Sequence, residues 1–325
     1  MKLCVDTGTV LRLEETVIPK PTEDEVVFRV KACGICGSDL PRVFAGKSYF
    51  YPIVLGHEFA GVVEDSNDPA LIGKRAAVFP ILPCGTCEFC AREEWANCVK
   101  YDYYGSRRDG GMQDHLLVKK ENLIFLPDEV SDAAGSMVEP MAVCLHAVKK
   151  AKIDKDSVVT VYGAGTIGVL CAMWARAFGA KQVYISDVDT ARLVFAKSLG
   201  FAVSADETPD IVIEASGAAA AVNASLEKIR AFGKLVIVGN TERDVTLTQA
   251  AYSKLLRKQL TVFGSWNADR RHDVDDWKDS IDAIAKGILN PELLITHRFP
   301  LAEADRAFAM IGERKTFYNK ITLVM

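Results

Sequence analysis

The chain has 325 residues, a formal net charge of −4 and 49% hydrophobic residues. At roughly 100–200 residues per domain this length predicts two domains, and the slight acidity gives no electrostatic reason to expect DNA, RNA or an anionic membrane as a partner. The N-terminal residues lack an apolar signal-peptide core, and no apolar run reaches the roughly 18 residues of a membrane span. We therefore expect a cytoplasmic protein with reduced thiols.

The N-terminal half carries candidate metal ligands in short motifs. Cys36 stands in the stretch CGSD, His57 and Glu58 follow the run YPIVLG, and Glu139 comes just before a helical pattern. A thiolate, an imidazole and a carboxylate suit a catalytic zinc that keeps one coordination position open. Each residue also has a structural alternative: Cys36 as a small core residue, His57 as a hydrogen-bonded core histidine, and Glu139 as a carboxylate favoured by a helix dipole. Sequence separation alone does not show that they meet.

A cysteine-rich loop follows, with the spacing C-x2-C-x2-C-x7-C at Cys84, Cys87, Cys90 and Cys98. Four thiolates this close can surround one tetrahedral ion and leave no position for substrate. The intervening residues are polar, so a bound zinc would supply the folding energy that apolar burial lacks there. The spacing predicts a structural zinc. Two disulfides, disfavoured by the compartment, and an iron–sulfur cluster are the alternatives.

A dinucleotide-binding motif begins at residue 158. The β-branched run VVTVY leads into Gly163-x-Gly165-x-x-Gly168, and an apolar helical pattern follows. The first two glycines allow a tight turn and the close approach of a pyrophosphate, and the third lets the helix pack on the strand. The N-terminus of the helix, with Thr166 and Ile167, then faces the phosphate charge.

Asp187 ends the next predicted strand, KQVYIS. Its carboxylate would accept hydrogen bonds from the adenosine ribose hydroxyls and repel a 2′-phosphate, which favours NAD over NADP. Arg192 could bind such a phosphate instead, or lie on the solvated face of the following helix.

Strands and helices continue to alternate: strand DIVIEAS, helix 218–231, strand KLVIVG, helix 248–259 and strand LTVFGS. This rhythm predicts a doubly wound parallel sheet over 141–264. The flanking parts, 1–140 and 265–325, are richer in short strands and turns. The final strand, NKITLVM, is too isolated to fold unless it completes a sheet elsewhere, so we expect one discontinuous β-rich domain from both parts.

In this combination and order the motifs resemble those of the zinc-dependent medium-chain alcohol and polyol dehydrogenases. The matching pieces are CGSD, GHEF, the four-cysteine loop, Glu139-Pro140 and the glycine motif with Asp187, and the match extends through the whole chain. The resemblance implies an α/β fold in which a Rossmann domain is inserted into a GroES-like catalytic domain. It also implies NAD, two zinc ions per subunit (one catalytic, one structural) and a homodimer or homotetramer. Compared with the family, the stretch 201–214 leaves out most of a helix.

The resemblance further implies roles for individual residues. Cys36, His57 and Glu139 would bind the catalytic zinc, and the glutamate of MVEP is typical of polyol-type members. Glu58 would bind the metal directly or lie just behind it. Ser38 would pass the proton of the substrate hydroxyl outward, or else stabilise the CGSD turn.

Several stretches, among them GSDLPRVFAGK and YDYYGSRRDGG, narrow the match to members that oxidise a secondary alcohol of a polyol phosphate to a ketose phosphate. Binding a phosphate requires cationic or N–H donors. The candidates, each of which could equally be a solvated surface residue, are Arg42, Lys47, Arg107, Arg108 and Arg298. Tyr49 and Trp266 could line the substrate site or belong to the core or its rim.

Three other interpretations compete with this one. Sibling enzymes that act on sorbitol, butanediol or threonine share the zinc and Rossmann motifs. A non-catalytic protein of this fold should lack a ligand, whereas Cys36, His57, Glu139 and the four loop cysteines are all present. A nucleic-acid-binding zinc protein is disfavoured by the charge and by the lack of basic patches interleaved with aromatic residues.

Overall fold

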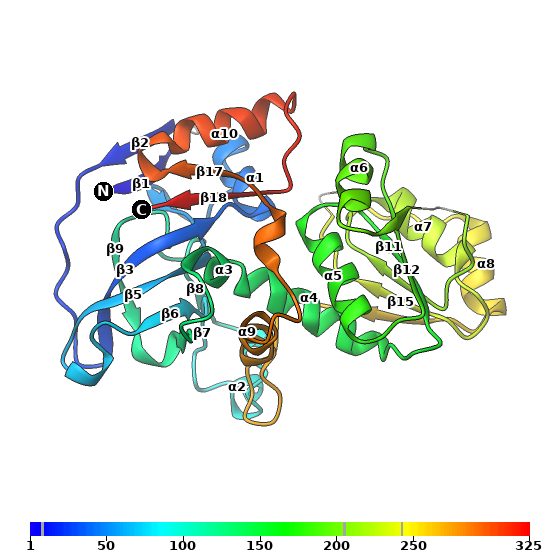
Figure 1. The fold of residues 1–325 in the computed structure, drawn as a ribbon, viewed down its shortest axis with the longest axis horizontal. Coiled ribbons are helices and arrows are strands. Elements are labelled where there is room, and N and C mark those ends of the chain that lie inside the picture. The colour runs from blue at the N-terminus through cyan, green and yellow to red at the C-terminus, as the bar shows by residue number, and fades with distance from the viewer. Residues whose placement is uncertain (8–9, 204–205, 242) are drawn as a thin grey trace. The chain divides into compact units, whose positions relative to one another are not determined.

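The computed structural model describes residues 1–7, 10–203, 206–241 and 243–325. They form two compact units, one of Met1–Glu139 with Asp269–Met325 and one of Pro140–Ala268. In Figure 1 the first unit is mainly β-sheet, whereas the second has helices around a central sheet. The unit boundaries fall at 139/140 and 268/269, where the sequence suggested 140/141 and 264/265.

The largest sheet of the first unit is built around its longest strand, β3 (Glu25–Gly34). β3 pairs antiparallel with three strands that come from distant parts of the chain. In the described residues this sheet also contains β5 (Glu58–Ser66), β6 (Arg75–Val78), β9 (His115–Lys119), β10 (Leu123–Phe125), β17 (Ile295–Pro300) and β18 (Lys320–Val324). The last strand, β18, lies between β3 and β17. The C-terminal strand therefore completes a sheet that the N-terminal part began, as its isolation in the sequence predicted.

Apolar side chains of β3 form the centre of the core of this unit. Val26, Phe28 and Val30 are buried against Phe59 of β5 and Leu323 of β18, and the rings of Phe28 and Phe59 meet edge to face at 6.2 Å. Aromatic and β-branched residues fit such a pleated, buried surface. The core therefore fixes the carboxyl end of β3, from which the candidate metal ligands follow.

Shorter elements surround this sheet. The remaining strands are β1 (Lys2–Asp6), β2 (Val10–Glu14), β4 (Ile53–Val54), β7 (Ile81–Leu82) and β8 (Asp102–Tyr103). The helices are α1 (Leu40–Phe44), α2 (Glu88–Ala91), α3 (Asp132–Ser136), α9 (Asp276–Ala285) and α10 (Ala304–Glu313), while α4 (Val138–Ala151) crosses the boundary between the units. β7 and β8 pair antiparallel, so the cysteine-rich loop is the connection of a β-hairpin.

The second unit is a parallel sheet with the strand order β13-β12-β11-β14-β15-β16 among the described residues. Its strands are β11 (Val158–Tyr162), β12 (Gln182–Ser186), β13 (Ala202–Val203), β14 (Ile211–Glu214), β15 (Lys234–Ile237) and β16 (Thr261–Gly264). The central strands are continuous apolar runs because helices cover both faces of a parallel sheet. These helices are α5 (Thr166–Ala177), α6 (Thr190–Ser198), α7 (Ala219–Lys228) and α8 (Gln249–Arg257). The direction of winding reverses between β11 and β14, which is where such sheets bind dinucleotides.

The connection from β13 to β14 is short. Residues 204 and 205 of the stretch 201–214 lie outside the described residues, and the described remainder of that stretch contains β13 and β14 but no helix. A search of the described helices finds none with the length and apolar character that a bilayer crossing requires.

Candidate active site and metal centres

The first ligand, Cys36, is held by a tight turn after β3. It precedes a single turn of 3₁₀-helix over Gly37–Asp39, and its backbone N–H donates to Asp39 Oδ2 at 3.0 Å. Asp39 is fully buried. The stretch CGSD therefore folds back on itself, which fixes the direction of the Cys36 thiol and leaves Ser38 exposed on the same turn.

His57 and Glu58 reach the same place from the start of β5. Ligand atoms of Cys36, His57 and Glu58 all lie within 4.8 Å of one another. Glu58 is opposite Gly34 in the β3–β5 ladder, and a Cβ on Gly34 would overlap the Glu58 carboxylate. The glycine at the end of β3 thus makes room for a carboxylate beside the thiol.

Asp39 also lies behind the imidazole. Its Oδ1 is 3.7 Å from His57 Nδ1, and both atoms are buried without a hydrogen-bond partner among the described residues. A carboxylate facing one ring nitrogen favours the tautomer whose other nitrogen can bind a metal. Sequence reasoning did not assign Asp39 this position, although it belongs to the CGSD motif.

Glu139 lies in the first turn of α4, near this group but outside the set of described ligand atoms within 4.8 Å. Its Oε1 accepts a hydrogen bond from Tyr103 Oη at 3.4 Å, and the Tyr103 ring is 5.7 Å from the His57 ring. Burial raises the pKa of Glu139 to about 7, with a further contribution from the Glu58 carboxylate. Tyr103, which the sequence analysis did not single out, therefore connects Glu139 to the other ligands.

Lys320 of β18 supplies a cation behind the ligands. Its Nζ donates to both carboxylate oxygens of Glu58, at 2.9 and 2.6 Å, and to the Ile35 carbonyl at 3.2 Å. The side chains are 4% and 1% exposed, so this is a buried ion pair between residues 262 positions apart. The sequence analysis missed Lys320. The feature that could have identified it is a charged residue at the start of the otherwise apolar strand KITLV.

The chemistry of this site suits a divalent cation. Burial alone would lower the pKa of His57, but the charges of Cys36 and Asp39 raise it to about 10, so this group of residues favours a positive charge. Thiolate, imidazole and carboxylate oxygen are the donors that zinc binds in catalytic sites. The residues present therefore fit a catalytic zinc.

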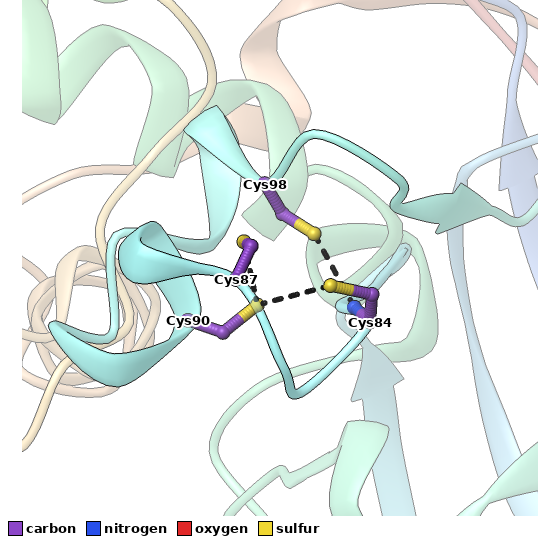
Figure 2. A group of neighbouring side chains, drawn as sticks. All are labelled: Cys84, Cys87, Cys90 and Cys98. Carbon is purple, nitrogen blue, oxygen red and sulfur yellow. Dashed lines mark hydrogen bonds between the residues drawn. The ribbon is translucent and has the colours of Figure 1, made fainter.

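The four cysteines of the β7–β8 loop form a second cluster (Figure 2). All four are free thiols, and their sulfur atoms lie within 4.8 Å of one another. Cys84 and Cys90 sulfurs are 3.9 Å apart, and those of Cys87 and Cys90 are 3.5 Å apart. Four sulfurs at about 2.3 Å from one tetrahedral zinc would be about 3.8 Å apart, which is close to both distances.

The protonation of these thiols also fits a metal. A hydrogen bond from Thr86 lowers the pKa of Cys84 to about 6, whereas burial and the neighbouring thiols raise the pKa of Cys90 to about 12. A thiolate disfavours the ionisation of a further thiol beside it unless a cation compensates the charge. A zinc ion bound by all four sulfurs would provide that compensation.

The glycine motif of the second unit forms a turn between β11 and α5. Gly163 has a φ of +100°, which glycine adopts without strain. A Cβ on Gly168 would overlap the Gly163 carbonyl oxygen, whereas a Cβ on Gly165 would meet only Arg192 Nη1, at 3.8 Å. Packing thus requires a residue without a side chain at Gly168. At Gly165, by contrast, a ligand can still approach the backbone that continues into Thr166 and Ile167.

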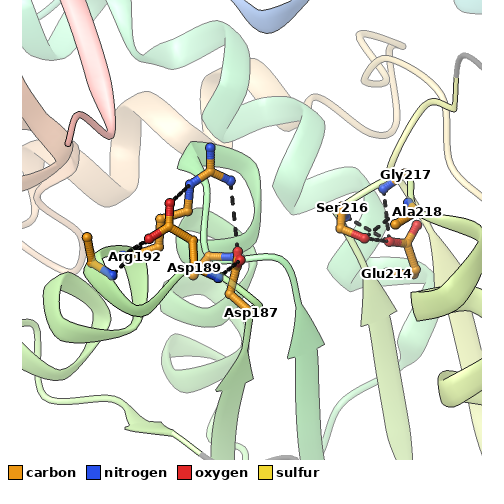
Figure 3. A network of polar contacts seen from close by, with 9 residues as sticks. Asp187, Asp189, Arg192, Glu214, Ser216, Gly217 and Ala218 are labelled. Carbon is orange, nitrogen blue, oxygen red and sulfur yellow. Dashed lines mark hydrogen bonds and ion pairs between the residues drawn. The ribbon is translucent and has the colours of Figure 1, made fainter. Parts of the chain in front are cut away.

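Asp187 lies beside this turn at the end of β12 (Figure 3). Its Oδ2 accepts the Ala164 N–H at 2.6 Å and its Oδ1 accepts the Asp189 N–H at 2.8 Å. Arg192 extends from α6 to within 3.9 Å of Asp187 and 3.8 Å of Asp189. The Arg192 side chain is therefore partly exposed but directed toward the two aspartates.

Glu214 organises the neighbouring turn after β14. It is fully buried, and its Oε1 accepts hydrogen bonds from the N–H groups of Ser216 and Gly217 and from the Ser216 hydroxyl (Figure 3). The sequence analysis assigned it only to a strand. The loops after β11, β12 and β14 thus present ordered backbone at one edge of the sheet.

The candidate phosphate-binding residues are scattered over the first unit. Arg298 pairs with Glu292 at 3.0 Å, and Arg108 with Asp102 at 3.4 Å. Arg42 donates to the Ser38 carbonyl one turn earlier in the chain, and Lys47 lies exposed after α1. Arg107 lies between two tyrosine rings, 4.8 Å from that of Tyr49 and 4.3 Å from that of Tyr101.

Comparison with known families assigns the class of protein. Residues 22–128 match the alcohol dehydrogenase GroES-like domain, and residues 166–286 match the zinc-binding dehydrogenase domain. The chain belongs to the zinc-dependent medium-chain dehydrogenases, oxidoreductases that act on CH–OH groups. Zinc and NAD are the cofactors expected of it.

Individual relatives are polyol dehydrogenases. The chain is 36% identical to galactitol 1-phosphate 5-dehydrogenase of Escherichia coli K12, over 98% of each protein. It is 31% identical to sorbitol dehydrogenase of Bombyx mori, over 91% of each. It is also 31% identical to D-arabitol-phosphate dehydrogenase of Enterococcus avium, over 91% of this chain and 89% of the relative. These relatives thus include both phosphorylated and unphosphorylated polyols in their names.

Solved structures show the same fold over the whole chain. Galactitol-1-phosphate dehydrogenase of Escherichia coli matches with a TM-score of 0.92 and 34% identity, covering 100% of this chain and 99% of the other. An Escherichia coli CFT073 alcohol dehydrogenase complexed with NADH has a TM-score of 0.91 at 25% identity, covering 100% and 98%. A zinc-binding dehydrogenase of Sinorhizobium meliloti bound to NADP matches equally well, with a TM-score of 0.91, 26% identity and the same coverage.

Proposed function

We propose that this protein uses NAD to oxidise a secondary alcohol of a polyol phosphate to a ketose phosphate, with galactitol 1-phosphate as substrate and tagatose 6-phosphate as product. The observation that carries the proposal is the group Cys36, His57 and Glu58, with Glu139 nearby, in a chain 36% identical to a galactitol 1-phosphate dehydrogenase over nearly its whole length. The names of the two 31% identical relatives include one unphosphorylated and one phosphorylated polyol.

The residues of the first unit have distinct tasks in this reaction. Cys36, His57 and a carboxylate, from Glu58 or Glu139, would hold the zinc, which lowers the pKa of a bound hydroxyl. Asp39 orients the His57 ring through the nitrogen that faces it. Ser38, exposed on the turn after Cys36, accepts the hydroxyl proton and passes it outward.

NAD is the proposed cofactor because of Asp187. A carboxylate at the end of β12 accepts hydrogen bonds from ribose hydroxyls and repels a 2′-phosphate. Arg192 is already engaged with Asp187 and Asp189, at 3.9 and 3.8 Å, which lowers its availability for a 2′-phosphate. We therefore expect a kcat/KM for NAD at least about tenfold above that for NADP, a preference of about 1.4 kcal/mol.

The test is the rate of NADH formation with galactitol 1-phosphate, measured beside galactitol, sorbitol, butanediol and threonine, with and without added zinc. A strong preference for the phosphate ester supports the proposal. Equal or faster oxidation of an unphosphorylated alcohol would replace it with the sibling activity that the sorbitol dehydrogenase relative represents. Failure to oxidise any of them, with zinc and NAD bound, would favour a non-catalytic protein.

We further propose that the chain self-associates as a homodimer, or as a homotetramer built from dimers, in the cytoplasm. β16 is one of the two edge strands of the parallel sheet among the described residues, and Val262 in it is 43% exposed. Large apolar side chains nearby in sequence, Tyr252, Leu256 and Trp266, are exposed as well. An open edge with exposed apolar residues is a site where strands from two chains can pair. The free thiols fit a reducing compartment.

A further inference from the structure

Two adjacent arginines follow strand β8 and face different surroundings. Tyr103 and Asp102 alternate in β8 and so point to opposite faces of it, and Tyr101 directly precedes the strand. The rings of Tyr101 and Tyr103 meet at 6.1 Å. Arg108 is on the side of Asp102, with which it forms an ion pair, whereas Arg107 is on the side of the tyrosines.

Arg107 is held in place by groups other than carboxylates among the residues that the structure describes. Its guanidinium packs over the rings of Tyr49 and Tyr101, Nη1 donates to the Tyr101 carbonyl at 3.1 Å, and Nη2 donates to Tyr49 Oη at 3.4 Å. Among the described residues, no carboxylate lies within the 4.0 Å of an ion pair with it. A guanidinium has more N–H donors than these two acceptors occupy. The charge of Arg107 is thus oriented but not neutralised.

The aromatic residues connect Arg107 to the candidate metal ligands. The ring of Tyr101 contacts that of Tyr103, whose hydroxyl donates to Glu139 and whose ring is 5.7 Å from that of His57. Two tyrosine side chains, Tyr101 and Tyr103, thus connect Arg107 to Glu139 and His57 by a series of contacts within one unit. In galactitol 1-phosphate the phosphate is on C1 and the reacting hydroxyl on C5, so the phosphate must also lie away from the metal.

The other arginine candidates are less suited to this task. Arg108 and Arg298 are already neutralised by Asp102 and Glu292. Arg42 also lacks an ion pair among the described residues, but it donates to the Ser38 carbonyl of its own turn and no aromatic ring fixes its plane. An anion binds most strongly to an arginine whose fork is positioned in advance and whose charge is free.

We propose that Arg107, held between Tyr49 and Tyr101, binds the phosphate group of the polyol phosphate and so determines selectivity for phosphorylated substrates. The inference rests on the proposed function. Tyr49 is 68% exposed, so the stacked pair lies at the surface, where an extended substrate can place a charged end. The binding is a charge-assisted hydrogen bond that contributes to ground state and transition state alike, so it acts on KM rather than on kcat.

The test compares galactitol 1-phosphate with galactitol for wild type, Arg107→Gln, Arg107→Lys and the matched control Arg108→Gln, all loaded with zinc. The measured quantity is the ratio of kcat/KM for the ester to kcat/KM for galactitol, in which the fraction of folded enzyme cancels. For Arg107→Gln we expect this ratio to fall about 10- to 100-fold through KM for the ester. Arg107→Lys should fall less, because it keeps the charge, and Arg108→Gln should stay within about threefold of wild type.

A second readout is inhibition by inorganic phosphate, whose Ki against the ester should rise about tenfold or more in Arg107→Gln and stay near wild type in Arg108→Gln. If the wild type prefers the ester and Arg107→Gln keeps both the preference and the Ki, the assignment of Arg107 is wrong while the proposed function stands. The assignment is also wrong if Arg107→Gln lowers kcat/KM equally for both substrates, since that indicates a structural role. If the wild type does not prefer the ester, the proposed function fails and the assignment with it.

Discussion

The ion pair of Glu58 and Lys320 makes the candidate active site dependent on the last strand of the chain. Both side chains are buried, so each charge relies on the other instead of on water. Removing one partner of such a pair costs about 3–5 kcal/mol, because the remaining charge is left uncompensated. The carboxylate that faces Cys36 and His57 is therefore held by a residue far away in the sequence.

Lys320→Met tests this dependence. We expect the free energy of unfolding, measured by urea denaturation of the metal-free protein, where no zinc compensates the Glu58 charge, to fall by about 3–5 kcal/mol. The control is Lys315→Met, which removes an exposed ion pair with Glu313 at 3.5 Å and should change stability by less than about 1 kcal/mol. Equal effects of the two substitutions would contradict the view that the buried pair matters more than an exposed one.

At the level of elements, we expect the cysteine-rich loop to depend on a bound zinc. The loop has only a four-residue helix, α2, and one 3₁₀ turn over Trp95–Asn97. The ring of Trp95 packs on that of Phe79 at 5.8 Å, and Glu93 accepts the His272 N–H. The residues between the cysteines are mostly polar or partly exposed, so we expect zinc to supply much of the folding energy of the loop.

Cys90→Ser should therefore lower the zinc content by one ion per chain and open the loop. Arg92 lies inside the loop with its side chain about half exposed, so trypsin cleavage after Arg92 reports the opening. We expect the cleavage to become at least about tenfold faster, as it does when a local structure loses more than about 1.4 kcal/mol. Cys171→Ala, a buried cysteine of α5, is the control for zinc content and should leave it unchanged. Unchanged zinc content in Cys90→Ser would exclude a four-cysteine site.

The turn between β11 and α5 offers a pair of glycines with opposite requirements. Gly168→Ala should lower the free energy of unfolding by about 1–3 kcal/mol, because its Cβ overlaps the Gly163 carbonyl. Gly165→Ala should leave stability within about 0.5 kcal/mol yet raise KM for NAD about tenfold or more, because the added methyl group occupies the approach of the pyrophosphate. Urea unfolding and NAD titration of both variants provide the measurements. If Gly165→Ala binds NAD normally, the pyrophosphate does not lie at this turn.

At the level of the whole molecule, the proposed dimer places β16 of one chain against β16 of a second copy. Val262→Lys introduces a charge on this edge and should oppose such pairing. We expect the molar mass from light scattering to shift toward the monomer, with NAD binding retained. A wild-type protein that is already monomeric at micromolar concentration would contradict the proposed dimer.

The parts of this molecule that were predictable from sequence are those encoded locally. The run from β11 through α5 to Asp187 is contiguous, so its periodicity and glycine spacing carry the information needed to place it. The contact of Lys320 with Glu58 was not predictable, because it depends on which strands become neighbours in the sheet. The same holds for Tyr103, whose hydroxyl meets Glu139 across 36 positions of chain. Arg107 and Arg108 are adjacent in the turn after β8, and the sequence does not show that one meets Asp102 and the other Tyr49 and Tyr101.

The cysteine-rich loop joins β7 to β8, two strands that pair through only two residues each. A ladder of two residues is too short to be stable by itself. β8 contains Tyr103, and Tyr101 directly precedes it, so the positions of both tyrosines depend on this hairpin. The thiols that close this hairpin are ordinary targets of oxidants when their metal is lost. We therefore expect oxidation of these thiols by peroxide to weaken the preference for galactitol 1-phosphate over galactitol, measured as the ratio of their kcat/KM values, so that substrate selection would respond to the redox state of the protein's surroundings.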